Sequence, residues 1–311
     1  MIVSLEIAVE LIKSGEVVAI PTETVYGLAA DALNIHAVEK TFRLKKRPAD
    51  NPLIVHICSM DQLNSLSSEI SDDAIRLATA YWPGPLTMVF KKRSHIPDMV
   101  TAGLNTVAIR LPDHPLTQSL IKQTSPLTAP SANISGRPSP TKADHVLDDF
   151  DESVPVLDGG PCRIGLESTV IDLTGNIPVI LRPGSITADM IFKDTGISVA
   201  DHAVTFDNLK KSPGTRFSHY KPIASVSWLN HVPTAFDKRS YYIFHSDQFS
   251  IQAENVTCYN GDYERFAKNL YDHFRRADHL GYNHILIESM SGIMDSQFTS
   301  ALTDRISKAI G

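Results

Sequence analysis

Three consecutive cations, Lys45, Lys46 and Arg47, are the first residues whose types and spacing could support chemistry. They end a helical pattern that begins after Asn34, and Asn51 follows closely. Cations near a helix C-terminus compensate the helix dipole, which is a purely structural role. The same cations, together with Asn51 and the apolar run behind it, could instead hold an anion. Both interpretations stay open on these residues alone.

Arg110 lies inside an apolar run, 106–111, that predicts a β-strand. An arginine on a covered face of a sheet needs an anionic partner, because an unpaired buried charge is costly. That partner can be a ligand with a carboxylate or phosphate group, or a carboxylate of the protein itself. The sequence leaves the two alternatives open.

Two loops rich in hydroxyl groups could provide uncharged hydrogen-bond donors to a ligand. Residues 21–24, Pro-Thr-Glu-Thr, follow a strand-like run, and residues 127–140 are dense in Ser, Thr, Asn and Pro. Prolines fix the backbone while hydroxyls and amides can point at phosphate or ribose oxygens, although an ordinary stiff turn has the same composition. Thr141 and Asp144 form a capping pattern for a helix beyond the second loop.

Glu167 and Arg182 lie at the start and end of a predicted hairpin, in which residues 169–173 and 179–181 are strands joined by a turn at 174–176. The hairpin brings the two side chains near each other and predicts a mixed sheet. In isolation, such a pair is most often an ion pair on the protein surface.

Hydrophobic periodicity indicates the elements that must position these residues. In the second helix, Ile35, Val38 and Phe42 recur at i, i+3, i+7, which predicts its buried face. Helices are expected at 5–12 (capped by Ser4), 35–47, 61–66, 72–81, 185–196, 262–280 and 299–310. Further strands are expected at 17–20, 53–57, 86–90, 154–157, 223–229, 241–244 and 284–288.

Composition is ordinary for a soluble globular protein, which excludes disordered and fibrous classes. The chain has 311 residues, of which 42% are hydrophobic and 21% charged, and a net charge of −6, so any polyanion site must be a local basic patch. Three distant cysteines without C-x-x-C spacing argue against a disulfide framework or a zinc site, and no metal-binding residues are expected. Neither a leader nor a membrane-length apolar run is recognisable, which predicts a cytoplasmic protein. The two commonest nucleotide-binding glycine motifs are missing.

Residues 212–222 have neither helical nor strand periodicity and lie between turn signals. They hold Phe217, His219 and Tyr220, which is typical of a segment that docks on a protein and not of a passive linker. Strands and helices alternate beyond it, which predicts a second, smaller α/β module.

At this point the chain resembles the long, two-domain form of the YrdC/Sua family, the L-threonylcarbamoyladenylate synthases. The motifs that carry the resemblance are PTETVYGL from Pro21, KxRPxxxP from Lys45, LIVH ending at His56, WPGPLT, VAIRLP, APSANxSG, ESTVID, LRPG and SPGxxxxHYxP. The resemblance implies a twisted mixed-sheet YrdC-like domain with a concave cavity, and a smaller Rossmann-like α/β domain. The expected boundaries are 1–204 for the catalytic domain, 205–223 for a linker that acts as a lid, and 224–311 for the second domain.

The resemblance also implies a nucleotidyltransferase that makes threonylcarbamoyl-AMP and pyrophosphate from L-threonine, bicarbonate and ATP, with Mg2+ accompanying the ATP. The product would pass to a tRNA threonylcarbamoyl transferase for t6A modification next to the anticodon. By position, threonine would be held by Thr24, His56, Arg110, Ala129 and Ser168. ATP would be held by Arg47, Asn51, Thr106, Ser131, Ser139, Arg182 and Tyr220, with Lys45 and Arg47 as the catalytic cations beside the phosphates.

Two other functions stay open. One is a carbamoyl-adenylate enzyme of the same fold with a substrate other than threonine. The other is an RNA-binding module without turnover, because a concave basic surface suits a phosphate backbone.

Overall fold

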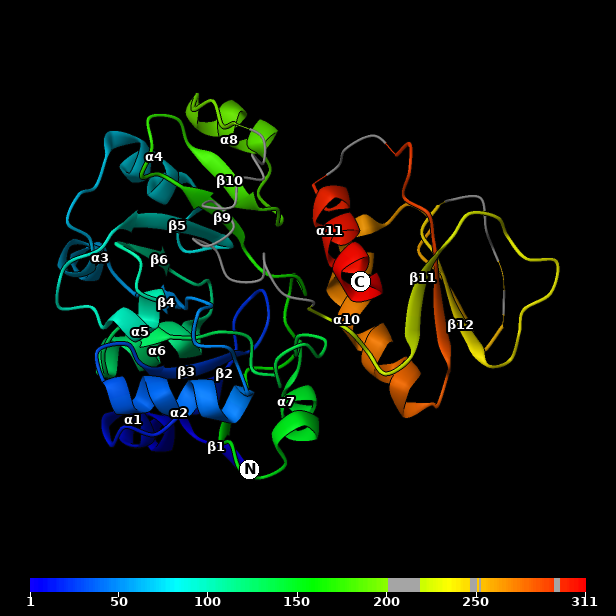
Figure 1. Ribbon diagram of the computed structural model, residues 1–311, viewed down its shortest axis with the longest axis horizontal. Coiled ribbons are helices and arrows are strands. Elements are labelled where there is room, and N and C mark those ends of the chain that lie inside the picture. Colours follow the sequence, from blue (N-terminus) through cyan, green and yellow to red (C-terminus); the bar gives the residue numbers. More distant parts are fainter. Residues whose placement is uncertain (201–218, 247–250, 252, 294–296) are drawn as a thin grey trace.

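The computed structural model describes residues 1–200, 219–246, 251, 253–293 and 297–311, and the statements below concern these residues. Two sheets, each with its own helices, form two domains (Figure 1). Most of the predicted linker, 205–218, lies outside the described residues. The expectation of a mixed-sheet α/β domain followed by a smaller α/β domain is confirmed.

The described part of the first domain contains one ten-stranded mixed sheet, in the spatial order β1-β8-β2-β3-β7-β4-β6-β5-β9-β10. The strands are β1 (Ile2–Val3), β2 (Val18–Ile20), β3 (Gly27–Asp31), β4 (Ile54–His56), β5 (Leu86–Lys91), β6 (Thr106–Arg110), β7 (Leu127–Thr128), β8 (Val156–Leu157), β9 (Thr169–Asp172) and β10 (Val179–Arg182). β4 and β6 run parallel with His56 opposite Arg110, and β9 and β10 form the predicted antiparallel hairpin. The site residues at these strand ends are therefore neighbours.

The helices of the first domain cover this sheet. They are α1 (Leu5–Lys13), α2 (Ile35–Lys45), α3 (Met60–Leu66), α4 (Asp72–Tyr81), α5 (Asp98–Thr101), α6 (Pro115–Gln123), α7 (Ala143–Phe150) and α8 (Ala188–Thr195). Ser4 and Asn34 accept hydrogen bonds from the first-turn amides of α1 and α2, as expected for N-caps.

Two local predictions are wrong. Ile35, the first residue of α2, is 44% exposed, whereas Val38 and Phe42 are buried, because the buried face of the helix begins only at Ala37. The predicted Thr141 and Asp144 cap does not form at α7, which begins after Lys142. The Thr141 amide instead donates a hydrogen bond to the ring of His145. Thr141 therefore orients the buried His145 side chain and does not cap the helix.

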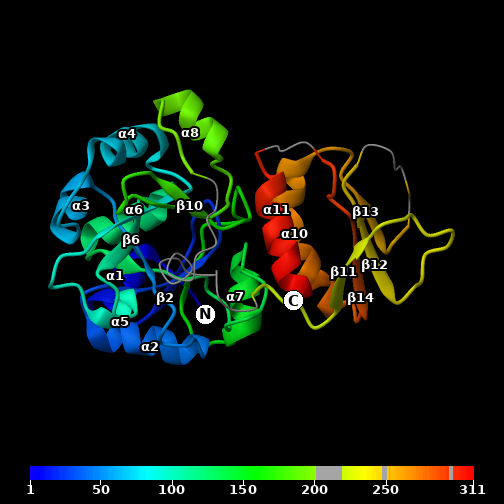
Figure 2. The same cartoon turned by 45° about the horizontal axis from the view of Figure 1, so that its top comes forward.

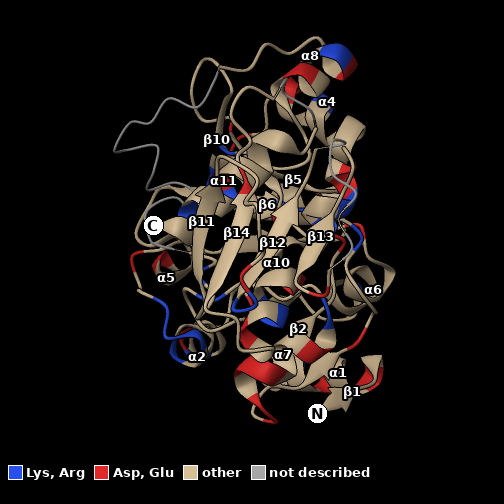
Figure 3. Cartoon of the chain, turned by 90° about the vertical axis from the view of Figure 1, so that its right-hand side faces the viewer, with Lys and Arg blue, Asp and Glu red and all other residues tan. Residues whose placement is uncertain are grey.

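The second domain is a four-stranded parallel sheet, in the order β11-β14-β12-β13, with two long helices on one face. Its elements are β11 (Ser225–Leu229), β12 (Ser240–Phe244), β13 (Val256–Cys258), α10 (Tyr263–His279), β14 (His284–Glu288) and α11 (Thr299–Ile310). Figure 3 looks onto the sheet from the side opposite the helices and shows strands that are almost entirely uncharged.

Helices α10 and α11 lie between the second sheet and the first domain (Figures 1 and 2). One buried apolar cluster crosses this boundary: Val25, Ile164 and Leu166 of the first domain pack with residues that include Phe266 and Leu302 of the second. Gly165 lies at the contact with φ +81, and a Cβ atom there would overlap the backbone of Lys268 on α10. The close approach of the two domains therefore requires glycine at this position.

Within the described ranges, no helix is both long enough and apolar enough to cross a bilayer.

Candidate active site

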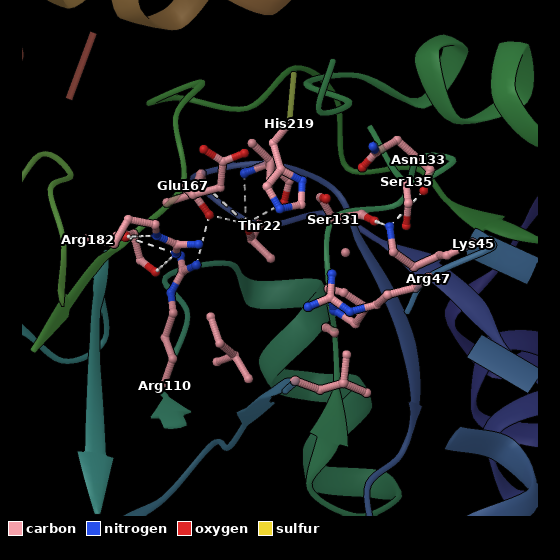
Figure 4. A pocket seen from close by; sticks show the side chains of 18 of the residues that line it. Thr22, Lys45, Arg47, Arg110, Ser131, Asn133, Ser135, Glu167, Arg182 and His219 are labelled. Atoms are coloured by element: carbon pink, nitrogen blue, oxygen red, sulfur yellow. Dashed lines mark hydrogen bonds between the residues drawn. The ribbon is translucent and has the colours of Figure 1, made fainter. Parts of the chain in front are cut away.

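A pocket opens in the first domain where β4, β6, β7 and the β9-β10 hairpin bring their polar ends together. Figure 4 shows Arg110 and Arg182 on one side of it and Lys45 and Arg47 on the other. Most of the residues predicted from the sequence line this pocket: Thr24, Lys45, Arg47, His56, Arg110, Ala129, Ser131, Ser168, Arg182 and Tyr220. Strands far apart in the sequence thus deliver the predicted residues to one place.

Three predicted residues, Asn51, Ser139 and Thr106, lie outside this lining. The Asn51 carbonyl accepts a hydrogen bond from Arg47 at 3.2 Å, and the Ser139 hydroxyl donates to Glu167 at 2.6 Å, so both adjoin lining residues. Thr106 begins β6 and pairs with Lys91, at the opposite end of the strand from Arg110. Its assignment as an ATP contact stays a prediction.

Arg110 has both kinds of partner that the sequence left open. Its Nη2 atom lies 2.7 Å from Glu23 Oε1 in a buried ion pair, so a structural carboxylate is present. Its Nη1 atom donates to the Thr24 hydroxyl at 2.8 Å, and its Nε atom donates to the Gly84 carbonyl at 3.2 Å. Because the guanidinium also lines the pocket, it is held in place by the protein and presented to a ligand.

Lys45 and Arg47 point into the pocket, whereas Lys46 between them is exposed. The Lys45 ammonium is buried and donates to the carbonyls of Ser131 and Asn133, the latter at 2.7 Å. Burial and the neighbouring Arg47 hold the pKa of Lys45 well below its ordinary value. Burial also lowers the pKa of Arg47, to about 9. Lys45 still lies in the last turn of α2, where a cation favours the helix dipole, but its side chain is buried in the pocket and not on a solvated face.

Two histidines in the pocket are held neutral. Burial, reinforced by Arg110, lowers the pKa of His56 to about 3. Burial, reinforced by Arg47, lowers the pKa of His219 to about 4. A neutral imidazole can accept a hydrogen bond from an ammonium or hydroxyl group, which an imidazolium cannot.

Glu167 and Arg182 are both buried, so the prediction of a surface ion pair is wrong. Arg182 donates to the Ser168 carbonyl from Nε at 3.1 Å and from Nη2 at 3.0 Å, and to the Ser168 hydroxyl at 3.1 Å. Burial would raise the pKa of Glu167, but Arg305 and Arg182 outweigh it and lower the pKa to about 2. Glu167 is therefore a carboxylate under all physiological conditions.

The pocket also contains residues that the sequence analysis did not assign to a site. Those with polar side chains are Thr22, Asn133, Ser135, Glu167 and His219, and Gly136 lies beside Ser135. All but Glu167 belong to segments already singled out, namely the two hydroxyl-rich loops and the segment with aromatic residues between turn signals. The motifs therefore predicted some of the lining residues in each of these segments, but not the adjacent residues that also line the pocket.

A mixed α/β sheet directs four cations and a row of hydroxyls into one pocket, an arrangement that suits an enzyme with anionic substrates. Residues 10–184 match the model of the Sua5/YciO/YrdC family, whose description reads "telomere recombination", and residues 186–311 match that of the threonylcarbamoyl-AMP synthase C-terminal domain. The chain belongs to the Sua5/YciO/YrdC family, in its two-domain form.

Curated relatives extend over nearly the whole chain. A threonylcarbamoyl-AMP synthase of Pyrococcus abyssi is 41% identical over 99% of this chain and 94% of its own length. The threonylcarbamoyl-AMP synthase of Bacillus subtilis is 40% identical over 98% of this chain and 92% of its own length. The crystal structure of P. abyssi Sua5 complexed with L-threonine superposes with a TM-score of 0.88 at 39% identity, covering 100% of this chain and 97% of that one.

Proposed function

We propose that this chain is a threonylcarbamoyl-AMP synthase, which converts L-threonine, bicarbonate and ATP into threonylcarbamoyl-AMP and pyrophosphate. The observation that carries the proposal is a single pocket with the guanidiniums of Arg110 and Arg182 on one side and the cations of Lys45 and Arg47 on the other, which together suit a carboxylate and a row of phosphates. Two findings support it: nearly full-length relatives are named threonylcarbamoyl-AMP synthase, and the fold matches that of a Sua5 structure complexed with L-threonine.

In this proposal the threonine carboxylate lies against Arg110 and the Thr24 hydroxyl, and neutral His56, Ala129 and Ser168 surround the rest of the amino acid. The threonine ammonium first loses a proton to solvent, and the neutral amine then attacks the carbon of bicarbonate, with loss of water, or of CO2, with release of a second proton to solvent. A neutral His56 suits this step, because it does not repel the amine's positive charge during binding.

The carbamate oxygen then attacks the α-phosphorus of ATP, and the bond to the β-phosphate breaks with departure of pyrophosphate. Charge accumulates on the leaving phosphates, so we assign Lys45, Arg47 and Arg182 to them and Ser131, Ser139, Asn51 and Tyr220 to the rest of the nucleotide. Such a reaction is accelerated by position and electrostatic stabilisation.

Mg2+ would neutralise part of the charge on the departing pyrophosphate. Glu167 is the one carboxylate among the described residues of the lining, and its oxygens already accept bonds from Ser139 and from the second domain. The lining therefore fits a magnesium ion that arrives with ATP, bound to the phosphates.

The product would be passed to a tRNA threonylcarbamoyl transferase for t6A formation next to the anticodon. We expect the reaction to occur in the cytoplasm, where ATP, bicarbonate and tRNA are available together.

The test is pyrophosphate release by the purified protein with ATP, Mg2+, bicarbonate and one amino acid at a time. Release should require both threonine and bicarbonate, with serine as the nearest competitor, because a missing methyl group changes selectivity by only about 1 to 3 kcal/mol. Equal rates with glycine or leucine would favour another carbamoyl-adenylate reaction. Tight, salt-sensitive RNA binding without ATP turnover would favour the RNA-binding alternative.

A further inference from the structure

The Glu167 carboxylate is the point at which the second domain reaches the pocket. Arg305, on α11, has its Nε atom 2.7 Å from Glu167 Oε2. The Tyr271 hydroxyl, on α10, lies 3.0 Å and 3.2 Å from the two carboxylate oxygens. Both side chains are fully buried, and Arg305 also donates to the Pro183 carbonyl at 3.0 Å. Glu167 lines the pocket of the first domain, and the cation in contact with it, Arg305, belongs to the second domain.

The first domain offers Glu167 a different set of groups. The Ser139 hydroxyl donates to it at 2.6 Å. Arg182 also faces its charge, but the described bonds of Arg182 run to the Ser168 carbonyl and hydroxyl. After Arg305, Arg182 is the cation with the largest electrostatic effect on Glu167, so removal of Arg305 would draw Arg182 from Ser168 toward Glu167.

The same two residues support Tyr220. The Arg305 guanidinium lies 5.5 Å from the centre of the Tyr220 ring, and the rings of Tyr220 and Tyr271 are 5.3 Å apart. Tyr220 is buried and lines the pocket with φ +68, a backbone conformation that its surroundings must stabilise.

We propose that Arg305 and Tyr271 are positioning residues for the nucleotide subsite. Arg305 neutralises the charge of Glu167, and Tyr271 donates a hydrogen bond to it, so Arg182 stays hydrogen-bonded to Ser168. The same two side chains hold the Tyr220 ring in the pocket lining. Arg182 and Tyr220 therefore both face ATP. This inference rests on the proposed function for the identity of the nucleotide, and it gives the second domain a part in the reaction.

The experiment measures the Kd of ATP by calorimetry without threonine, and the KM values of ATP and threonine during pyrophosphate release. Arg305→Met should raise the Kd and KM of ATP about tenfold, as expected for a charge-assisted contact. Tyr271→Phe, which keeps the ring against Tyr220, should raise them less, and Arg305→Lys should recover part of the loss. The KM of threonine should change less than that of ATP.

Asp272→Asn is the matched control. Asp272 follows Tyr271 on α10 and also contacts the first domain, with an oxygen 2.6 Å from Lys142 and 3.0 Å from His145, outside the pocket lining. Loss of an interdomain contact as such should therefore leave the affinity for ATP unchanged.

A second variant separates positioning from simple support of the fold. In Glu167→Gln/Arg305→Met the charge that attracts Arg182 is gone, so the double variant should bind ATP more tightly than Arg305→Met, and the loss that remains should be the part due to the missing contact with Tyr220. Wild-type affinity in folded Arg305→Met, or additive losses in the double variant, would overturn the inference. If the wild type lacks threonine-dependent turnover, the proposed function fails, while the ATP titrations still decide whether Arg305 and Tyr271 position the subsite.

Discussion

Glu23 and Arg110 form an ion pair of 2.7 Å in which both side chains are almost completely buried. The second oxygen of Glu23 accepts the backbone amide of Asp113 at 3.1 Å, which fixes the carboxylate, and the carboxylate in turn fixes the guanidinium. A side chain held this way needs little rearrangement to receive a ligand. The Arg110 guanidinium therefore faces the pocket in a fixed orientation.

Arg110→Ala should weaken threonine binding far more than ATP binding, and Arg182→Ala should do the reverse. Each substitution removes charge-assisted contacts worth about 1.5 to 3 kcal/mol, or about 10- to 100-fold in affinity. Calorimetric titration of each ligand into each variant measures the two losses separately. Similar losses of both ligands in both variants would contradict the division of the pocket.

Arg163→Ala is the control for Arg110→Ala. Arg163 pairs with Asp113 at 2.8 Å on the surface, and both side chains are largely exposed. An exposed pair contributes about 0 to 1 kcal/mol to stability. This variant should bind threonine and ATP like the wild type.

Lys45→Met should reduce pyrophosphate release at saturating substrates by about a hundredfold or more, because it removes a cation from the leaving phosphates. Lys46→Met, one residue away and exposed, should retain the wild-type rate. The paired comparison is made by following pyrophosphate at one enzyme concentration. Equal effects of the two substitutions would show that the cations act only through net charge.

Stability should decrease as the pH falls from about 6.5 to about 4, in part because of His273. Burial lowers the pKa of this side chain to about 4, and both ring nitrogens contact tyrosine hydroxyls, of Tyr241 and Tyr259. The unfolded chain binds a proton in this pH range while the native histidine does not, so lower pH favours unfolding.

His273→Gln should be less stable than the wild type at pH 7, but its stability should fall less steeply with pH. The difference in slope is expected to be about 1.4 kcal/mol per pH unit between pH 6.5 and 4. Urea unfolding at half-unit pH steps measures it. Parallel curves for the two proteins would show that His273 does not titrate on unfolding.

Gly165→Ala should destabilise the protein by more than the substitution of another glycine with positive φ. Gly103 has φ +78 with open space around its Cβ position, whereas at Gly165, with φ +81, the added carbon meets the backbone of Lys268. Left-handed backbone costs an alanine about 1 kcal/mol or more in either case. Any further loss in Gly165→Ala, measured by urea unfolding, reports the contact between domains. Equal losses would mean that α10 moves aside without cost.

The sequence predicted the longest helices, α2, α10 and α11, and strands β4, β5 and β6 well, because their apolar patterns are clear. It failed where a residue's neighbours come from elsewhere in the chain. Strands β7 and β13 have only two and three residues, and β3, Gly27–Asp31, is buried along nearly its whole length and shows no alternating pattern. The Thr141 amide donates to the ring of His145 and does not cap a helix.

The site shows the same division. Motif positions predicted the residues of the pocket, but not which of them would be paired. Glu167 was expected to bind Arg182 on the surface, since the hairpin places them near each other. Its contacting partner, Arg305, is on α11 and distant in the sequence, so local patterns carried no signal of the pair.

The apolar cluster that crosses from Val25, Ile164 and Leu166 to α10 and α11 has a consequence for how the molecule unfolds. Separating the domains would expose that cluster and leave Glu167 without Arg305, so neither domain can lose its structure at little cost to the other. The two domains should therefore melt in one cooperative calorimetric transition, although they have separate sheets. If the chain were cut once between the domains, the two fragments should stay associated as a non-covalent pair. The contacts between the domains would be sufficient for this, without a covalent connection.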